Sequence, residues 1–340
     1  MKLGLKFGLE TLTKENMQFA RQMGVTHIVV HSPRLGDDWG HLGRQRHHSA
    51  VSTAQDGVLD YFELLRMKKF VDSCDLELCA IENLPGDHMY PIVHALPERD
   101  AQIAKVCTTI ENMGKVGIPI LGYYFSLAGV SGHWRAYGSG GGRGDAGLKS
   151  FDYALVKDAP PIVDEEVSVE EMWSRLAYFL ERVVPVAEKA GVKLAAHQDD
   201  PPAESLFGTG RLLTNHDAMQ RLIDLVPSEH NGLEFCQGTV AEMGPEKTVE
   251  AVSRFATQGK IFYVHFRNVR GGFPKFDEVF IDEGDVNMIA ALKAYRDAGY
   301  DGVITPDHTP RVIADEGGLR GKAFALGYIR AGLQALELLD

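Results

Sequence analysis

The sequence predicts an α/β protein that folds as one closed (β/α)8 barrel, or TIM barrel, over residues 1–340. Short runs rich in β-branched and aromatic residues alternate with amphipathic stretches, and this alternation occurs eight times. Several amphipathic stretches end in Gly just before the next expected strand, as in the segments "QMGVTHIVV", "KAGVKLAAH" and "DAGYDGVIT". Because no linker rich in Pro, Ser or Gly separates two halves, the pattern favours a closed barrel over a doubly wound open sheet.

The expected strands are the short apolar runs, because such runs bounded by turn residues are typical of buried parallel strands. In chain order they span residues 3–7, 27–31, 77–81, 119–125, 193–197, 232–236, 261–266 and 302–305. The expected helices are the stretches whose apolar residues recur every three or four positions. In chain order they span residues 14–23, 59–71, 99–113, 169–189, 218–225, 249–256, 286–298 and 319–338.

Two segments fit neither pattern and are expected to be long loops, residues 32–57 and 126–167. The second contains the Gly-rich phrase "GSGGGRGDAG". This phrase lacks the Lys-Ser/Thr of a P-loop and the strand-to-helix spacing of a dinucleotide-binding turn. It is therefore interpreted as a mobile loop or lid.

Composition and charge narrow the class of protein. A hydrophobic content of 44% and a charged content of 24% are those of a globular protein with a large core. The net charge of -12 argues against a nucleic-acid or anionic-membrane partner. The N-terminus has no apolar signal segment and no stretch reads as a transmembrane span, so a cytoplasmic location is expected. Four scattered cysteines do not form a disulfide framework.

Metal-binding side chains stand at the ends of the last four expected strands: His197, Cys236, His265 and Asp307. In a parallel barrel the C-terminal strand ends converge on one rim, so these four are expected to share one volume. Any one of them alone is more often a loop or core residue than a ligand, but four equivalent positions together predict a divalent metal site. A mixed set of nitrogen, oxygen and sulfur donors leaves Zn, Mn, Fe and Co open.

Polar residues that follow the strand ends are candidates for catalysis or substrate binding. His308 diverges from its neighbour Asp307, which leaves its imidazole free as an acid or base. Those that could orient ligands or bind a polar substrate are Asp199, Asp200, Arg267, Asn268 and Arg270. For each of these, a solvated loop charge is an equally reasonable interpretation.

The segments "EEMWSRLAYFLERVVPVAEKAGVKLAAHQDDPP", "NGLEFCQGT", "VHFRNVR" and "DH" resemble the mannonate dehydratase family, whose members have a xylose isomerase-like TIM barrel. The resemblance is dense from about residue 168 to residue 310. It implies that His197, Cys236, His265 and Asp307 bind Mn²⁺, with Fe²⁺, Co²⁺, Mg²⁺ or Zn²⁺ as other choices. It further implies dehydration of D-mannonate to 2-keto-3-deoxy-D-gluconate, with His308 as general acid, and a homo-oligomer.

Three departures from the family pattern affect the expected site. Gln198 stands where the family has Pro, and "GYYFSLAGVSGHWRAYG" replaces the family's fourth-strand motif. Only Trp134 and Arg135 have counterparts there, and Arg135 is the candidate for substrate binding. Near the last helix the family has a proton-transfer tyrosine. The position is occupied here by Lys322, and Tyr328 is the nearest tyrosine, so either residue is a candidate for that catalytic role.

Three functions remain open from the sequence. A metal-dependent sugar-acid dehydratase comes first, with D-mannonate or a related aldonate as substrate. The missing tyrosine favours, as an alternative, a sugar isomerase or epimerase of the xylose isomerase-like superfamily. A third reading is a non-catalytic sugar-acid sensor with a structural metal. Formation of a 2-keto-3-deoxy acid distinguishes the first function from the other two.

Overall fold

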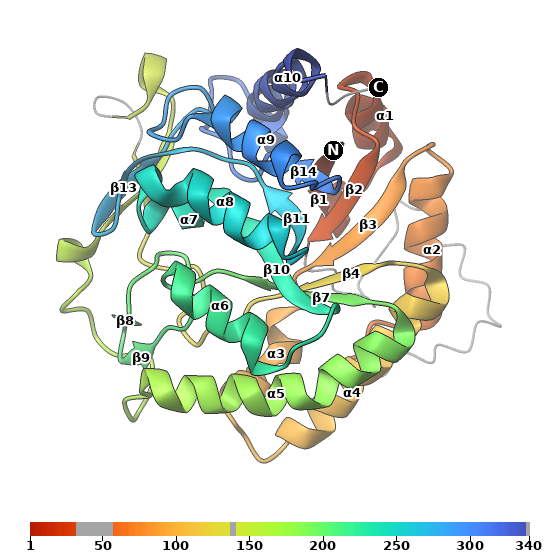
Figure 1. Ribbon diagram of the computed structural model, residues 1–340, viewed down its shortest axis with the longest axis vertical. Helices are drawn as coiled ribbons and strands as arrows, with labels where there is room; N and C mark the ends of the chain where they lie inside the picture. The colour runs from red at the N-terminus through yellow and green to blue at the C-terminus, as the bar shows by residue number, and fades with distance from the viewer. Residues whose placement is uncertain (32–56, 137–140, 338–340) are drawn as a thin grey trace.

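The computed structural model describes residues 1–31, 57–136 and 141–337. Eight parallel strands form a closed barrel, in the order β1, β2, β3, β4, β7, β10, β11, β14 and back to β1 (Figure 1). Their bounds are β1 Lys2–Gly8, β2 His27–His31, β3 Glu77–Glu82, β4 Ile120–Tyr123, β7 Lys193–His197, β10 Asn231–Cys236, β11 Ile261–His265 and β14 Val303–Thr305. The predicted fold class and all eight predicted strands are confirmed.

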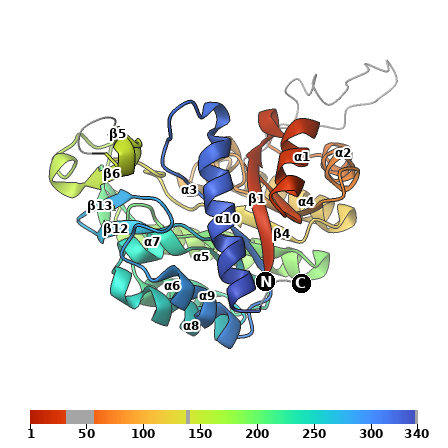
Figure 2. The same ribbon diagram turned by 90° about the horizontal axis from the view of Figure 1, so that it is seen from above.

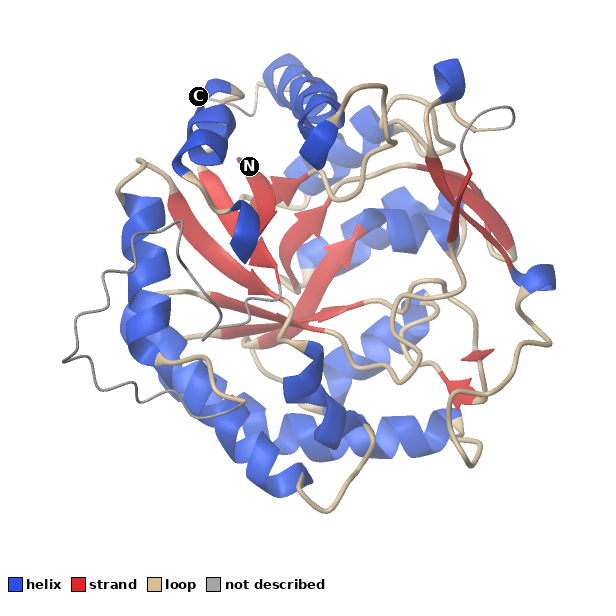
Figure 3. Ribbon diagram, turned by 180° about the vertical axis from the view of Figure 1, so that it is seen from behind, coloured by secondary structure: helices blue, strands red, loops and turns tan. Residues whose placement is uncertain are grey.

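Helices surround the strands, as the view from behind shows (Figure 3). The predicted helices correspond to α1 Lys14–Gln22, α2 Tyr61–Asp72, α4 Arg99–Val116, α5 Val169–Ala190, α6 His216–Leu225, α8 Thr248–Thr257, α9 Met288–Asp297 and α10 Leu319–Ala335. Two short helices, α3 Gly86–Val93 and α7 Gln237–Glu242, were not predicted. In the described ranges, no helix is both long and apolar enough to cross a bilayer.

Helix α5 illustrates how the local sequence sets the boundaries. Ser168 precedes the helix, and its side chain accepts a hydrogen bond from the backbone N–H of Glu171. The helix ends at Ala190, and the residue that caps it, Gly191, has a positive φ of 69°. Glycine adopts this left-handed conformation without steric cost, so the chain turns directly into β7. The predicted function of the Gly in "KAGVKLAAH" is confirmed.

Two apolar clusters stabilise the barrel. The larger cluster packs the outer faces of the strands against the helices. The smaller one consists of strand residues alone, including Cys79, Ala195, Tyr263 and Val303, and these fill the barrel interior. The barrel is therefore a packed support, and the polar chemistry is concentrated where its strands end.

A second sheet, which the sequence analysis missed, extends from the C-terminal rim. Its antiparallel strands follow the order β12 Val269–Gly272, β13 Lys275–Glu278, β6 Leu148–Asp152 and β5 Trp134–Ala136. Figure 2 shows the four strands together at one side of the molecule. The segment 126–167, expected to be a loop, therefore carries two strands. The other expected loop, 32–57, lies outside the described residues except for Gly57.

Candidate metal centre at the barrel rim

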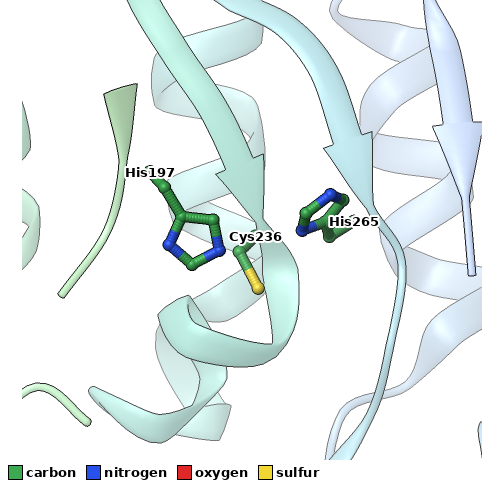
Figure 4. A group of neighbouring side chains, drawn as sticks. All are labelled: His197, Cys236 and His265. Atoms are coloured by element: carbon green, nitrogen blue, oxygen red, sulfur yellow. The ribbon is translucent and has the colours of Figure 1, made fainter. Parts of the chain in front are cut away.

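Three of the four predicted ligands meet at the ends of adjacent strands. His197 ends β7, Cys236 ends β10 and His265 ends β11. Cys236 and His265 are paired in the parallel register, and Figure 4 shows the two imidazoles on either side of the thiol. One ligand atom from each residue lies within 4.8 Å of the other two, and all three side chains are buried. The predicted convergence of these strand ends is confirmed for this trio.

Asp307 borders this trio without being part of it. It lies two residues beyond β14, and its Oδ1 is 3.7 Å from Nδ1 of His265. The carboxylate instead contacts two cations, with Oδ1 2.7 Å from Nζ of Lys6 and Oδ2 3.1 Å from Nε of Arg267. Metal binding by Asp307 stays a prediction.

The thiol of Cys236 is held in the form that binds metals. Burial would raise its pKa, but the charge of Arg267 and the neighbouring imidazoles of His197 and His265 outweigh burial and hold the pKa well below the usual value. The sulfur also accepts a hydrogen bond from Oγ1 of Thr239 at 3.2 Å. Because the thiolate is the form of cysteine that coordinates metals, these contacts prepare Cys236 for that role.

The two histidines are oriented by their neighbours. Nδ1 of His197 lies 2.6 Å from the carbonyl oxygen of Gln198, so Nε2 is the nitrogen left for a metal. Burial lowers the pKa of His197, yet the thiol of Cys236 and the carboxylate of Glu234 together raise it to about 9. Nε2 of His265 lies 2.7 Å from Oε2 of Glu82. The histidines and the thiolate thus form a set of compensating charges.

Sequence reasoning missed two carboxylates beneath the trio, Glu82 and Glu234. Glu82 ends β3, and Glu234 lies two residues before Cys236 on β10. Alternation along a strand places residues two positions apart on the same side, so the spacing to Cys236 was a usable signal for Glu234. The position of Glu82 at a strand end was another signal. The two carboxylates and His265 form a second group whose ligand atoms lie within 4.8 Å of one another.

The residues present fit a divalent ion. Both carboxylate oxygens of Glu234 and Nδ1 of His265 are buried without a hydrogen bond, although Oε1 of Glu234 lies 3.3 Å from Nε2 of His265. An unpaired polar atom in the interior is costly, and an ion bound by neighbouring side chains compensates for that cost. Imidazole, thiolate and carboxylate donors together suit a transition metal better than Ca²⁺ or Mg²⁺. The buried set could therefore hold a metal, and its donors do not fix which one.

His308 follows Asp307 in the chain, and its side chain is 35% exposed. Its Nδ1 is 2.8 Å from Oε2 of Glu278, and its Nε2 is 3.6 Å from Oδ1 of Asp307. The imidazole therefore reaches both the accessory sheet and the proposed metal site. Its catalytic role stays a prediction.

Lys322 and Tyr328, the two candidates for the proton-transfer role, both lie on α10 but have different surroundings. Burial lowers the pKa of Lys322, and the charges of Lys6 and Asp307 also act on its ammonium group. Tyr328 is half-buried against the larger core cluster, and the charged group that affects its pKa is Asp282. Six residues separate the two positions, which corresponds to about 240° of rotation around a helix. Lys322 is therefore the one next to residues of the rim.

The loop after β7 uses its polar residues to hold the chain in place. Gln198, where the family has Pro, accepts a hydrogen bond from the backbone N–H of Cys236 at 2.8 Å. Oδ2 of Asp199 accepts hydrogen bonds from the backbone N–H groups of Leu212 and Leu213, each at 2.9 Å. Substrate binding by Asp199 stays a prediction, but its position is explained by these backbone contacts.

Arg267 and Asp200 form a buried network behind the trio. Arg267 donates to Asp200 at 2.9 Å, to Glu242 at 3.0 Å and to Asp307 at 3.1 Å. Asp200 also lies 3.0 Å from Nε2 of His133. Both are only 2–3% exposed at their side chains, so in this structure they position other groups. Substrate binding by either residue stays a prediction.

The remaining candidates for ligand orientation or substrate binding are Asn268, Arg270 and Arg135. The side-chain amide of Asn268 donates to the carbonyl oxygens of Ile281 and Val286, so it fixes the chain beyond β13. Arg270 pairs with Asp277 on the exposed surface, which agrees with the solvated-charge interpretation. Arg135 lies on β5, and its side chain is outside what the structure describes.

Comparison with known proteins matches this geometry to one family. A model of the D-mannonate dehydratase (UxuA) family matches residues 162–338. Mannonate dehydratase of Streptococcus suis is 32% identical over 280 residues, which cover 74% of this chain and 75% of that protein. The crystal structure of mannonate dehydratase from Streptococcus suis serotype 2 is similar with a TM-score of 0.81 and 27% identity, covering 99% of this chain and 96% of that chain.

A more distant structure shares the fold alone. The xylose isomerase domain protein from Planctomyces limnophilus is 14% identical, with a TM-score of 0.61, and the match covers 99% of this chain and 98% of that chain. The barrel is thus of the xylose isomerase-like type. Because the family model matches just over half of the chain, including all three residues of the buried trio, the chain belongs to the D-mannonate dehydratase family.

Proposed function

We propose that the protein is a metal-dependent hydro-lyase that dehydrates D-mannonate, or a closely related aldonate, to a 2-keto-3-deoxy acid. The observation that supports this most directly is the buried trio of His197, Cys236 and His265, bordered by Asp307, whose Oδ1 lies 3.6 Å from Nε2 of the partly exposed His308. Its family relatives in Streptococcus suis carry the name mannonate dehydratase. The choice of D-mannonate rests on those relatives, and the reaction class rests on the residues as well.

His197, Cys236 and His265, with Asp307 as the fourth ligand, are the residues that would hold the ion, for which Mn²⁺ is our first choice. A bound divalent ion would supply Lewis acidity toward the carboxylate and neighbouring hydroxyl of the sugar acid. Lys6 and Arg267 already neutralise Asp307 in part. A bound divalent ion would add positive charge at this rim, against the overall net charge of -12, and would thereby favour an anionic substrate.

The elimination requires one proton acceptor and one proton donor. The C–H bond beside the carboxylate breaks and its proton passes to a base, for which Lys322 is the first candidate. The electron pair forms a C=C bond, and the C–O bond of the next carbon breaks. His308 gives the proton on Nε2 to the departing hydroxyl, which leaves as water. The resulting enol becomes the 2-keto acid by tautomerisation.

Lys322 is the better placed of the two α10 candidates for proton transfer. Burial and the neighbouring ammonium of Lys6 lower its pKa. A lysine with a lowered pKa has a larger neutral fraction, and the neutral amine can accept a proton. Lys322→Met is expected to reduce turnover strongly, whereas Tyr328→Phe is expected to leave it near the wild-type rate. The opposite ranking would transfer the role to Tyr328.

The direct test is incubation of Mn²⁺-loaded protein with D-mannonate and with its epimer D-gluconate, followed by measurement of 2-keto-3-deoxy acid. Product from D-mannonate that disappears in the metal-stripped protein supports the proposal. His308→Asn should abolish product while retaining metal, because the imidazole acts beside the ion. Deuterium from solvent in an unchanged or epimerised sugar acid, without elimination, would instead identify an epimerase. If no aldonate reacts, the remaining function is that of a non-catalytic protein that binds a sugar acid.

A further inference from the structure

We infer that Glu278, on the accessory sheet, is a positioning residue that holds the His308 imidazole so that Nε2 carries the transferable proton. The inference rests on the proposed function in one respect, the use of His308 as proton donor. It assigns a purpose to the accessory sheet, which lies outside the barrel.

The two oxygens of Glu278 have separate partners. Oε1 lies 3.0 Å from Nζ of Lys149 and 3.5 Å from Nη1 of Arg267. Oε2 lies 2.8 Å from Nδ1 of His308. One oxygen is thus held by cations, and the other is left to accept a hydrogen bond from the imidazole. The Glu278 side chain is only 6% exposed, so water competes little for this bond.

The sheet register explains how the carboxylate is held. Glu278 on β13 is directly opposite Lys149 on β6 in the antiparallel pairing. On the same two strands, the rings of Phe151 and Phe276 stack with their centroids 5.4 Å apart. Because the carboxylate extends from a paired and packed strand, its position is more restricted than it would be on a flexible loop.

The charges around Glu278 keep it ionised. Burial alone would raise its pKa, but Arg267, His308 and Lys149 outweigh burial and hold the pKa below its usual value. An ionised carboxylate is only an acceptor, so it requires a proton on Nδ1 of the imidazole that faces it. The neutral ring left after proton transfer therefore keeps its hydrogen on Nδ1, and the proton given to substrate comes from Nε2.

The geometry at the other nitrogen agrees with this assignment. Nε2 of His308 lies 3.6 Å from Oδ1 of Asp307, so it faces the rim next to the proposed metal site. A carboxylate that fixes the tautomer of a catalytic histidine is a general device, and its replacement by an amide can favour the wrong tautomer. Glu278 would thus act through His308 and not on the substrate itself.

The test compares Glu278→Gln and Glu278→Asp with a matched control, Asp277→Asn. Asp277 is the preceding residue on β13, and alternation directs it to the opposite face. There it lies 3.1 Å from Arg270 and accepts a hydrogen bond from Ser150 at 2.6 Å. The measurements are kcat and KM for D-mannonate, metal content, and the nitrogen-15 NMR shifts of the His308 ring, assigned with His308→Asn.

For Glu278→Gln we expect kcat to fall at least about tenfold with KM and metal content little changed. In metal-free protein, at a pH where the His308 ring is neutral, the ring shifts should move from an Nδ1–H form in the wild type toward a mixture of tautomers in Glu278→Gln. Glu278→Asp keeps the charge on a shorter side chain and should recover part of kcat. Asp277→Asn should match wild type in every measurement.

Three outcomes would overturn the inference: wild-type ring shifts in Glu278→Gln, an unchanged kcat, or loss of metal in that variant. If the wild-type protein turns over no aldonate, the proposed function fails by itself. The ring shifts still test the positioning by Glu278 in that case. Should the Gln variant be unfolded by circular dichroism, the Asp variant replaces it: its shorter side chain moves the carboxylate away from Nδ1, so the ring shifts should move in the same direction by a smaller amount, and unchanged shifts would overturn the inference.

Discussion

The two halves of the barrel contribute differently to the rim. The C-terminal half, with β7, β10, β11 and β14, supplies the trio and Asp307, and it lies in the range matched by the family model. The N-terminal half supplies Lys6 from β1 and Glu82 from β3. Nζ of Lys6 lies 2.8 Å from Glu82 and 2.7 Å from Asp307, so this one ammonium joins the two halves.

The C-terminal half thus supplies the proposed metal donors, and the N-terminal half supplies charged residues that balance the charge around them. The three residues of the trio approach one point because they end the adjacent strands β7, β10 and β11. Counter-charges need only lie within a few ångströms, because Coulomb attraction has no strict direction. The N-terminal half could therefore diverge from the family model while it keeps the rim electrically balanced. Variants in the two halves should accordingly show different defects.

The largest effect is expected from Cys236→Ser in the C-terminal half. Removing the thiolate should weaken metal affinity by more than the about 10–100-fold typical of supporting residues. The control is Cys79→Ser, a cysteine equally buried in β3 of the other half. Metal content after gel filtration and a competitive chelator titration measure the difference. Equal metal loss in both variants would contradict the assignment of donors to one half.

Lys6→Met should instead reduce stability. It leaves the buried carboxylates of Glu82 and Asp307 without their shared cation, which should lower the free energy of unfolding by about 3 kcal/mol. The control, Lys293→Met, breaks an exposed pair with Asp297 and should change stability by less than about 1 kcal/mol. Urea denaturation of both variants is the measurement. A stable Lys6→Met protein would mean that the two carboxylates are neutralised by other groups.

A smaller effect is expected where the loops of β7 and β10 meet. Gln198→Ala removes the acceptor for the buried backbone N–H of Cys236 and should lower the free energy of unfolding by about 1–3 kcal/mol. His197 keeps its own contact with the backbone at this position, so metal content should stay near the wild-type level. Urea denaturation and metal analysis test the two statements separately. Metal loss would show that this hydrogen bond also places Cys236.

The smallest effect should be the same in both halves. Thr13 caps α1 in the N-terminal half, and Asn215 caps α6 in the C-terminal half, each by accepting a backbone hydrogen bond. Thr13→Ala and Asn215→Ala should each lower the free energy of unfolding by about 1 kcal/mol. Neither variant should alter metal content. A loss of metal in either would mean that helix ends are coupled to the rim.

The success of the sequence analysis was uneven for a physical reason. The strands and the major helices were predicted because periodicity and terminal Gly residues are local signals. The accessory sheet was missed because β13 pairs with β6, which lies more than a hundred residues earlier in the chain. The phrase "GSGGGRGDAG" drew attention to flexibility, although a strand lies just beyond it at Leu148–Asp152. Pairing partners of short strands cannot be read from either strand alone.

By itself, the sequence determined the barrel, the family and the convergence of three possible metal donors that end adjacent strands, His197, Cys236 and His265. Those features follow from local patterns repeated at equivalent positions. Only the tertiary structure decided which charges surround the donors. Lys6 meets Asp307 across 301 positions of chain, and Glu278 reaches His308 from a sheet that no local pattern indicated. Contacts between distant segments depend on how the whole chain closes, so their chemistry appears only when the fold is complete.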